Sequence, residues 1–262
     1  MFLKIFLFRR HSFSYLLLIT WFVLLSSCKT PAVQTFVHKQ NIPVTQEAIS
    51  SDSSIILLYS PYKEVLEKDL SRVIAYSDAE MIKGKPESEL TNFMADLLMK
   101  KATDISKEMN LDVLPDISYF NYGSIRSSIP EGEIAVSRAY ELMPFENQLV
   151  FAQLDGNKVK DFLNVLAAKG GDSVGGVRFV ISGEKATQIV IGGKEFDPAK
   201  KYWVATNSYV SEGGDGLTMF RESSQKITTD RLIRDLIIDY FAELQAKGIS
   251  ISAKKDGRIS IE

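Results

Sequence analysis

Cysteine and histidine are scarce in this sequence, and their scarcity excludes several kinds of site. The single cysteine, Cys28, cannot form a disulfide within the chain, and one cysteine cannot make a thiolate metal site. The two histidines, His11 and His38, both lie within the first forty residues. Catalytic zinc, iron and dinuclear phosphatase centres usually draw on two or more histidines, so the rest of the chain is a poor candidate for such a centre.

Net charge is also nearly absent. The chain has 31 basic and 33 acidic side chains, a formal charge of −2, and basic residues do not cluster beyond the first ten positions. The sequence therefore lacks the cluster of basic residues with which proteins bind nucleic acid, and we expect no nucleic-acid partner. The apolar fraction, in contrast, is 45%, which is enough for the core of a globular domain and too much for a disordered chain.

The amino terminus has the layout of an export signal. Lys4, Arg9 and Arg10 precede an apolar block at 13–25, which is shorter than the ~20 residues that a membrane-spanning helix needs. Leu-Ser-Ser-Cys at 25–28 resembles a bacterial lipobox. We therefore expect a signal peptide at 1–27, a lipid on Cys28, and a protein anchored to a bacterial membrane and facing the periplasm or the cell surface. The alternative is an uncleaved anchor with an incidental cysteine.

Residues 28–54 are polar, rich in Ser, Thr and Gln, and without sustained periodicity, so we interpret them as a flexible tether. The folded domain is then 55–262. It alternates irregularly between helices and strands, which predicts an α+β single domain with a mixed or antiparallel sheet and packed helices. Strands are expected at 55–59, 117–120, 148–154, 177–181, 188–191 and 202–206. Helices are expected at 61–70, after caps at Ser88, Ser137 and Asn157, and from Thr229 onward.

Three loops carry residues suited to binding. They read Asn-Tyr-Gly-Ser-Ile-Arg at 121–126, Pro-Phe-Glu-Asn at 144–147 and Thr-Asn-Ser-Tyr-Val-Ser-Glu-Gly-Gly-Asp-Gly at 206–216, and we name them the first, second and third ligand loops. Together they offer two aromatic rings, amides, an arginine for phosphate or ribose oxygens, and a carboxylate for hydroxyls. This inventory suits a nucleotide or nucleoside.

In order and spacing, the three loops resemble the C-terminal, substrate-binding domain of the 5′-nucleotidase family. The family pattern is Asn-x-Gly-Gly-Ile-Arg, then Pro-Phe-x-Asn, then Thr-Asn-x-Phe-x-x-x-Gly-Gly-Asp-Gly. The segment Glu-Ser-Glu-Leu-Thr-Asn-Phe-Met-Ala-Asp at 87–96 is similar to a fourth family pattern, Glu-x-x-Leu-Gly-Asn-Leu-x-x-Asp. The resemblance covers about residues 73–220.

The resemblance implies a role for each position. Phe145 and Tyr209 would clamp the base between their rings, and Tyr209→Phe would cost little if the ring alone makes the contact. Asp215 would bind the ribose hydroxyls, Asn121 and the Gly123 backbone would help with the base, and Arg126 would hold ribose or phosphate oxygens. Ordinary structural roles remain open for three residues: Phe145 as core, Arg126 as a surface ion pair and Asn147 as a cap or turn residue.

The chain also departs from the family. Tyr122 and Ser124 replace glycines, Tyr209 replaces a phenylalanine, and Pro86 stands where some members have an arginine, with Lys85 beside it. The Asp-x-His and Gly-Asn-His motifs of the family's metallophosphatase domain do not occur, so no cofactor is expected in this chain.

We therefore expect the binding half of a split 5′-nucleotidase, completed by a separate metallophosphatase chain that carries the divalent metals. The alternatives are a free-standing nucleoside- or nucleotide-binding lipoprotein with no hydrolase, and a structural lipoprotein whose pocket has decayed.

Overall fold

The computed structural model of the chain describes residue 21 and residues 52–262. The expected lipidation site at Cys28, the expected signal peptide at 1–27 and the expected tether at 28–54 fall outside the described residues, apart from Trp21 and the last three positions of the tether. Residues Ser54–Glu262 form one compact unit. Among the described helices, none is both long enough and apolar enough to cross a membrane.

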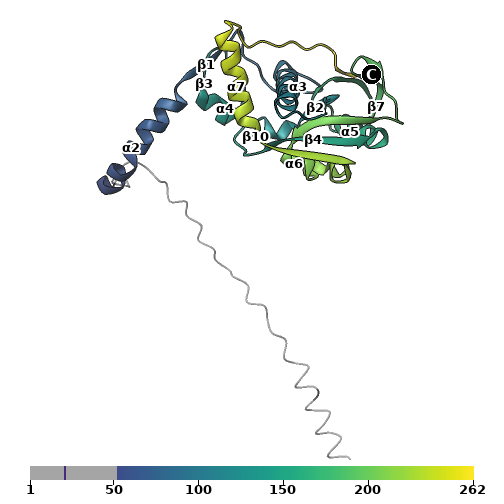
Figure 1. The fold of residues 1–262 in the computed structure, drawn as a ribbon, viewed down its shortest axis with the longest axis horizontal. Coiled ribbons are helices and arrows are strands. Elements are labelled where there is room, and N and C mark those ends of the chain that lie inside the picture. The colour runs from purple at the N-terminus through teal and green to yellow at the C-terminus, as the bar shows by residue number, and fades with distance from the viewer. Residues whose placement is uncertain (1–20, 22–51) are drawn as a thin grey trace, which may run out of the picture. The chain divides into compact units, whose positions relative to one another are not determined.

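Helices and strands are interleaved along the unit (Figure 1). The α-helices described are α2 (Ser53–Leu70), α3 (Glu89–Glu108), α4 (Val136–Leu142), α5 (Gly156–Ala168), α6 (Ser208–Ser211) and α7 (Ile233–Ala246). The strands are β1 (Val73–Ser77), β2 (Ile117–Phe120), β3 (Gly132–Ala135), β4 (Gln148–Asp155), β5 (Ser173–Gly175), β6 (Val177–Ser182), β7 (Lys185–Ile191), β8 (Lys194–Glu195), β9 (Lys201–Asn207), β10 (Gln225–Leu232) and β11 (Ile259–Ile261). Short 3₁₀ turns are η1 (Tyr122–Ser124), η2 (Gly214–Gly216) and η3 (Thr218–Glu222).

The central sheet has five strands in the order β10-β4-β9-β2-β5. Strands β2 and β9 run parallel, and the remaining neighbours are antiparallel. A four-stranded sheet, β11-β6-β7-β8, and a two-stranded pair, β1-β3, complete the fold. The prediction of an α+β domain with a mixed sheet and packed helices is confirmed.

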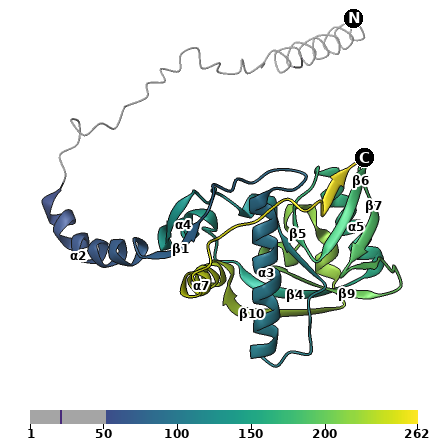
Figure 2. The ribbon, with the colours of Figure 1, turned by 90° about the horizontal axis from the view of Figure 1, so that it is seen from above.

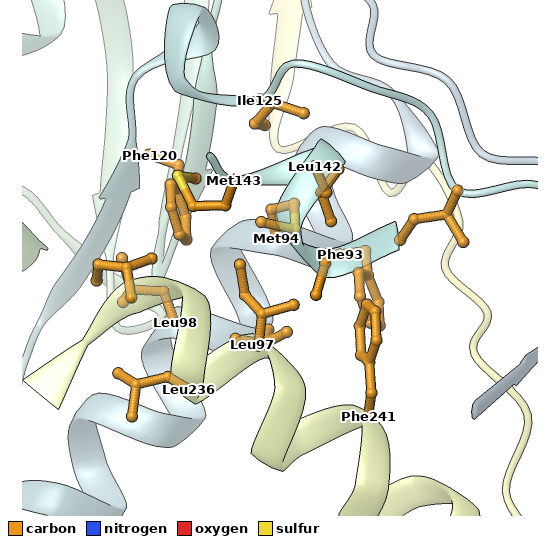
Figure 3. Close-up of a cluster of buried hydrophobic side chains, with 14 of the residues drawn as sticks. Phe93, Met94, Leu97, Leu98, Phe120, Ile125, Leu142, Met143, Leu236 and Phe241 are labelled. Carbon is orange, nitrogen blue, oxygen red and sulfur yellow. The ribbon is translucent and has the colours of Figure 1, made fainter. Parts of the chain in front are cut away.

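Two hydrophobic cores lie on opposite faces of the central sheet. Alternate residues of a strand point to opposite faces, so Phe151 joins one core while Ala152 and Leu154 join the other. The first core is made with α3, α4 and α7, whose side chains meet in Figure 3. The second is made with α5 and the four-stranded sheet. The central sheet is therefore buried on both faces.

Helix α3 follows the predicted pattern closely. Its N-cap Ser88 accepts a hydrogen bond from the Thr91 backbone N–H at 3.2 Å, and its apolar stripe is buried. The ring of Phe93 lies 6.0 Å from the ring of Phe241 on α7, centroid to centroid, and Figures 2 and 3 show the two helices side by side. The amphipathic period identified this helix because its burial is regular along the whole length.

Two predictions of local structure are wrong. Residues 55–59 are helical within α2, not a strand, because a short apolar run cannot by itself distinguish the two, and Leu58, Tyr62 and Val65 continue a helical stripe. All three side chains are exposed. Thr229 does not open the last helix, which begins at Ile233. Residues 225–232 instead form β10 against β4, where the Thr229 hydroxyl donates to the Leu149 carbonyl at 3.0 Å.

The starts of α4 and α5 are each displaced by two residues from the expected caps. The short helix α4 begins at Val136 after the N-cap Ala135, so Ser137 lies inside it. Helix α5 begins at Gly156 after the N-cap Asp155, so Asn157 is likewise inside. In both places the chain leaves a strand and turns directly into a helix, and the end of the strand sets the boundary.

Candidate functional site

The first and third ligand loops meet because β2 and β9 are parallel neighbours. In their register Ile117 lies opposite Val204 and Ser118 opposite Ala205. The carboxyl ends of parallel strands emerge at the same edge of a sheet. Asn121, just after β2, and Asn207, at the end of β9, are therefore neighbours although 86 positions separate them in the sequence.

The second ligand loop reaches the same edge from the opposite direction. Strand β4 is antiparallel to β9, and its residue Leu149 lies opposite Asn207. The start of β4 therefore lies where β9 ends. Phe145 and Asn147, which come just before β4, consequently lie beside the first and third loops. The backbone N–H of Gln148, the residue directly after the second loop, donates to the Ser208 hydroxyl of the third loop at 3.1 Å.

One cavity of about 320 Å³ opens between the three loops. Its volume lies in the range of small-molecule sites. All seven positions expected to bind substrate line this cavity, and Ser124 is the one further residue in its wall. The full lining is Asn121, Gly123, Ser124, Arg126, Phe145, Asn147, Tyr209 and Asp215. The structure brings the expected residues together, and their roles in binding remain predictions.

The carboxylate of Asp215 is fixed from two sides. The Asn121 amide Nδ2 donates to Oδ2 at 2.8 Å, and the Tyr209 hydroxyl donates to Oδ1 at 3.0 Å. An ionised carboxylate can accept about four hydrogen bonds, so each oxygen keeps a lone pair for another donor. The arrangement can therefore present an oriented anionic acceptor to hydroxyl groups in the cavity.

Asn121 is itself held in place. It is 3% exposed, and its Oδ1 accepts from the Asn207 amide at 3.0 Å and from the Ser124 hydroxyl. Asn207 in turn caps α6 by accepting from the Val210 backbone N–H at 2.9 Å. With its oxygen occupied and its amide on Asp215, the Asn121 side chain is suited to positioning Asp215 more than to reading a base edge.

The Gly-Gly-Asp-Gly segment has glycine where the backbone requires it. Gly213 adopts φ of 84°, in the left-handed region. At Gly214 an added Cβ would lie 2.4 Å from the Tyr209 ring, so only glycine lets this ring lie flat against the loop. Asp215 also has a positive φ, 55°, which aspartate tolerates better than most residues.

Both expected clamp rings are accessible. Phe145 is 39% exposed and Tyr209 is 48% exposed, so both rings can be reached by a ligand in the cavity. The simple core role for Phe145 is thus excluded by its exposure. The Arg126 guanidinium carbon lies 5.8 Å from the Phe145 ring centroid, and its NH1 donates to the Gly123 carbonyl at 3.2 Å. The Arg126 guanidinium therefore lies over the Phe145 ring of the second loop and donates a hydrogen bond within the first loop.

A buried acid, Asp172, lies directly before β5. Asp172 is 3% exposed and accepts from the Tyr119 hydroxyl at 3.1 Å and from the Ser173 backbone N–H at 2.8 Å. Burial raises the pKa of Asp172 to about 6, although both hydrogen bonds and the nearby Lys85 and Lys169 oppose the shift. Burial also raises the pKa of the Tyr119 hydroxyl well above its ordinary value, and the Asp172 charge adds to the shift.

The sequence did not assign a binding role to Ser124 or a supporting role to Asn207. Ser124 had appeared only as a departure from the family, yet its hydroxyl holds Asn121 and the residue lines the cavity. Asn207 could have been found from its place before a short helix, where asparagine is a preferred cap. Within the described residues, no group of three or more His, Cys, Asp or Glu side chains is placed to hold a metal ion.

The fold and the cavity define a class of protein: an α+β domain that encloses a ligand-sized cavity at one edge of a mixed sheet. Its family follows from the sequence profile described as "5′-nucleotidase, C-terminal domain", which matches residues 73–222. The match covers more than half of the chain, and the chain belongs to this family through that domain, the family's substrate-binding part.

Curated relatives carry names from nucleotide metabolism. The chain is 26% identical to a 5′-nucleotidase of Vibrio cholerae over 211 residues, which are 77% of this chain and 36% of that protein. It is 30% identical to the trifunctional nucleotide phosphoesterase protein YfkN of Bacillus subtilis over 224 residues, 76% of this chain and 14% of that protein. The chain thus spans about a third or less of the length of these two relatives.

Solved structures share the fold. The 5′-nucleotidase precursor of Thermus thermophilus superposes with a TM-score of 0.64 at 24% identity, over 82% of this chain and 44% of that one. The NAD nucleotidase of Haemophilus influenzae gives a TM-score of 0.61 at 19% identity, over 80% of this chain and 41% of that one.

Proposed function

We propose that this chain binds nucleosides or nucleotides, as the substrate-binding half of a 5′-nucleotidase. The base stacks between the Phe145 and Tyr209 rings, and Asp215 accepts hydrogen bonds from the ribose hydroxyls. The observation that carries the proposal is the convergence of three loops, distant in sequence, on one cavity with two exposed rings and an oriented carboxylate.

Each part of the ligand has a suitable partner. A flat base gains from two aromatic faces because stacking is worth about 1–3 kcal/mol per base. A vicinal diol suits a carboxylate whose two oxygens are separately oriented. Arg126 at the rim offers a planar donor for ribose or phosphate oxygens. Asn147 and Gly123 line the same cavity, and their amide and backbone groups are suited to the base edge.

Hydrolysis, in this proposal, belongs to a separate metallophosphatase chain. Two metal ions activate a hydroxide and stabilise the leaving oxygen in enzymes of that type, and their ligands are typically His and Asp side chains. The only histidines of this chain are at positions 11 and 38. This chain then positions the nucleotide, and the divalent metals are bound by its partner.

A lipid on Cys28 would place the binding domain at a bacterial membrane, facing the periplasm or the cell surface. The support is the arrangement of residues 1–28: basic residues, a short apolar block, and the only cysteine at the end of a lipobox-like sequence. The second candidate function, a free-standing binding lipoprotein without a hydrolase, rests on the same cavity and differs only in lacking the partner.

Titration calorimetry with residues 54–262 tests the proposal, using adenosine, cytidine and AMP. We expect saturable binding that is abolished or strongly weakened in the double variant Phe145→Ala/Tyr209→Ala. Tyr76→Ala is a matched control, since Tyr76 is 47% exposed and lies on β1, outside the cavity lining. Wild-type protein that binds none of the three ligands at millimolar concentration would refute nucleoside binding.

A second measurement distinguishes the split nucleotidase from the free-standing binder. The purified fragment should not hydrolyse AMP with added Mn²⁺, Zn²⁺ or Co²⁺. This chain should also be purified from membranes of the source organism that have been solubilised in mild detergent. The purified sample should hydrolyse AMP in the presence of metal and should contain a metallophosphatase chain identified by mass spectrometry. Purified chain with intact nucleoside binding but no such activity would favour the free-standing binder.

A further inference from the structure

Lys83 lies between β1 and α3, outside every motif that the sequence singled out. Its ammonium nitrogen donates to the Ile125 carbonyl at 2.7 Å and to the Tyr122 carbonyl at 3.3 Å. Both carbonyls belong to the first ligand loop. The same nitrogen lies 4.4 Å from the centroid of the Tyr122 ring, in cation–π contact. One cation thus holds the loop at two backbone positions and one side chain.

Partial burial lowers the pKa of Lys83, and the neighbouring Arg126 guanidinium adds to the effect. A half-buried ammonium gives up water and needs protein acceptors in exchange, and the two loop carbonyls supply them. Asn121, Gly123 and Arg126, which all line the cavity, lie on the loop that these bonds fix.

The third ligand loop is held by another lysine. The Lys169 ammonium, at the C-cap of α5, donates to the backbone carbonyl of Asp215 at 2.6 Å. Asp215 has a positive φ of 55°, a conformation that needs support from its surroundings in a residue other than glycine. A bond at the carbonyl of that residue helps to fix the direction of its carboxylate.

The two attachments are connected. The Lys85 ammonium donates to the Lys169 backbone carbonyl and lies 5.2 Å from the Tyr122 ring centroid. Gly171 packs so closely on the Pro86 carbonyl that an added Cβ would lie 2.2 Å from the oxygen. The segment around Lys83–Pro86 therefore contacts both the first loop and the C-terminal end of α5.

We propose that Lys83 and Lys169 are positioning residues, which hold the first and third ligand loops in the shape that binds a nucleoside. The proposal deepens the proposed function and rests on it for the ligand. It assigns these lysines to the loop backbone and not to the phosphate. Their removal should therefore weaken adenosine and AMP binding by the same factor, whereas loss of a phosphate contact would weaken AMP alone.

Hydrogen–deuterium exchange on the ligand-free fragment tests the loop contacts without any ligand. Lys83→Met should raise amide exchange in residues 122–126 by about tenfold, and Lys169→Met should do so in residues 213–217. Lys83→Arg should retain much of the protection. Lys160→Met and Lys158→Met are matched controls, because these lysines donate to the carbonyls of Ala186 and Glu222, outside the cavity lining.

Calorimetry then measures the consequence for binding. We expect each of Lys83→Met and Lys169→Met to weaken adenosine and AMP equally, by about tenfold, and the controls to change neither affinity. Unchanged exchange in both loops would overturn the proposal whatever the affinities do, and so would a loss confined to AMP. If wild-type protein binds no nucleoside, the proposed function fails, and the exchange data alone decide whether the lysines hold the loops.

Discussion

The Tyr209 hydroxyl and the Asp215 side chain fix each other within the third ligand loop. The hydroxyl donates to the carboxylate Oδ1 at 3.0 Å and accepts from the Asp215 backbone N–H at 3.3 Å. Tyr209 therefore combines two functions: its ring forms a wall of the cavity, and its hydroxyl orients the carboxylate. The family's usual phenylalanine at this position would keep the first function and lose the second.

The two clamp rings should each contribute strongly to nucleoside affinity. Phe145→Ala and Tyr209→Ala should each weaken adenosine binding about 5- to 150-fold, because each removes a stacking face worth about 1–3 kcal/mol. Tyr209→Phe should weaken binding about fivefold, more than the sequence alone suggested, because it removes the bonds to Asp215. Calorimetry measures all three. Alanine variants with wild-type affinity would mean that the ligand lies elsewhere.

Asp215 should determine recognition of the sugar. Asp215→Asn keeps the size of the side chain and removes its charge, and a hydrogen bond to a charged acceptor is worth about 1.5–3 kcal/mol. We expect the variant to lose most of the preference for adenosine over 2′,3′-dideoxyadenosine, with little change for the dideoxy compound. Equal loss for both nucleosides would indicate that Asp215 supports the loop and does not contact the ribose.

Asp172 should make stability depend on pH. Its folded-state pKa of about 6 exceeds the ordinary value of 3.8, so the folded protein holds the proton more tightly than the unfolded chain does. The contribution of protonated Asp172 to the free energy of unfolding is complete below about pH 3.8 and is lost as the pH rises through about 6. The loss is on the order of 3 kcal/mol for a shift of about two pKa units.

The matched variant for this effect is Asp172→Asn, which retains acceptors and donors for Ser173 and Tyr119 but cannot ionise. Urea unfolding at pH 4.5 and pH 7.5 should show the wild type losing stability relative to Asp172→Asn at the higher pH. A stability difference between the two proteins that does not change with pH would contradict the raised pKa.

Two leucines in helices should differ strongly in their response to truncation. Leu97 on α3 is 1% exposed within the first core, and Leu57 on α2 is 75% exposed. Leu97→Ala should lower the free energy of unfolding by about 2–5 kcal/mol, since it removes buried methyl groups and leaves a cavity. Leu57→Ala should change it by less than about 0.5 kcal/mol, because alanine is as good a helix former. A large effect at Leu57 would show that α2 packs on something in solution.

Cys28 should carry lipid in cells that recognise a lipobox. Metabolic labelling with radioactive palmitate should mark the wild-type chain and not Cys28→Ala, and residues 1–27 should be absent from the mature protein. The same variant provides the control for membrane association, which should be lost with the label. Equal labelling of both proteins would exclude this anchor.

Local sequence determined those parts of the fold whose burial is regular. The stripe on α3 and the strand patterns of β2, β4 and β9 are legible because each element buries one face, or both, along its whole length. Local sequence predicted the wrong element for residues 55–59 and for Thr229. At these places the residues are compatible with a helix or a strand, and the pairing of β10 with β4 is a long-range contact that local sequence does not record.

For the site, the sequence determined the chemistry and the tertiary structure decided the geometry. The sequence supplied two aromatic rings, an arginine, amides and a Gly-Gly-Asp-Gly segment whose glycines permit a positive φ and a close ring contact. Only the parallel pairing of β2 with β9, and the antiparallel pairing of β4, placed these groups at one edge. Only the packed structure showed that Tyr209 and Asn121 hold Asp215, and that Lys83 and Lys169 reach the loops from distant segments. The reason is that such contacts join residues many positions apart, and no local propensity or period records them.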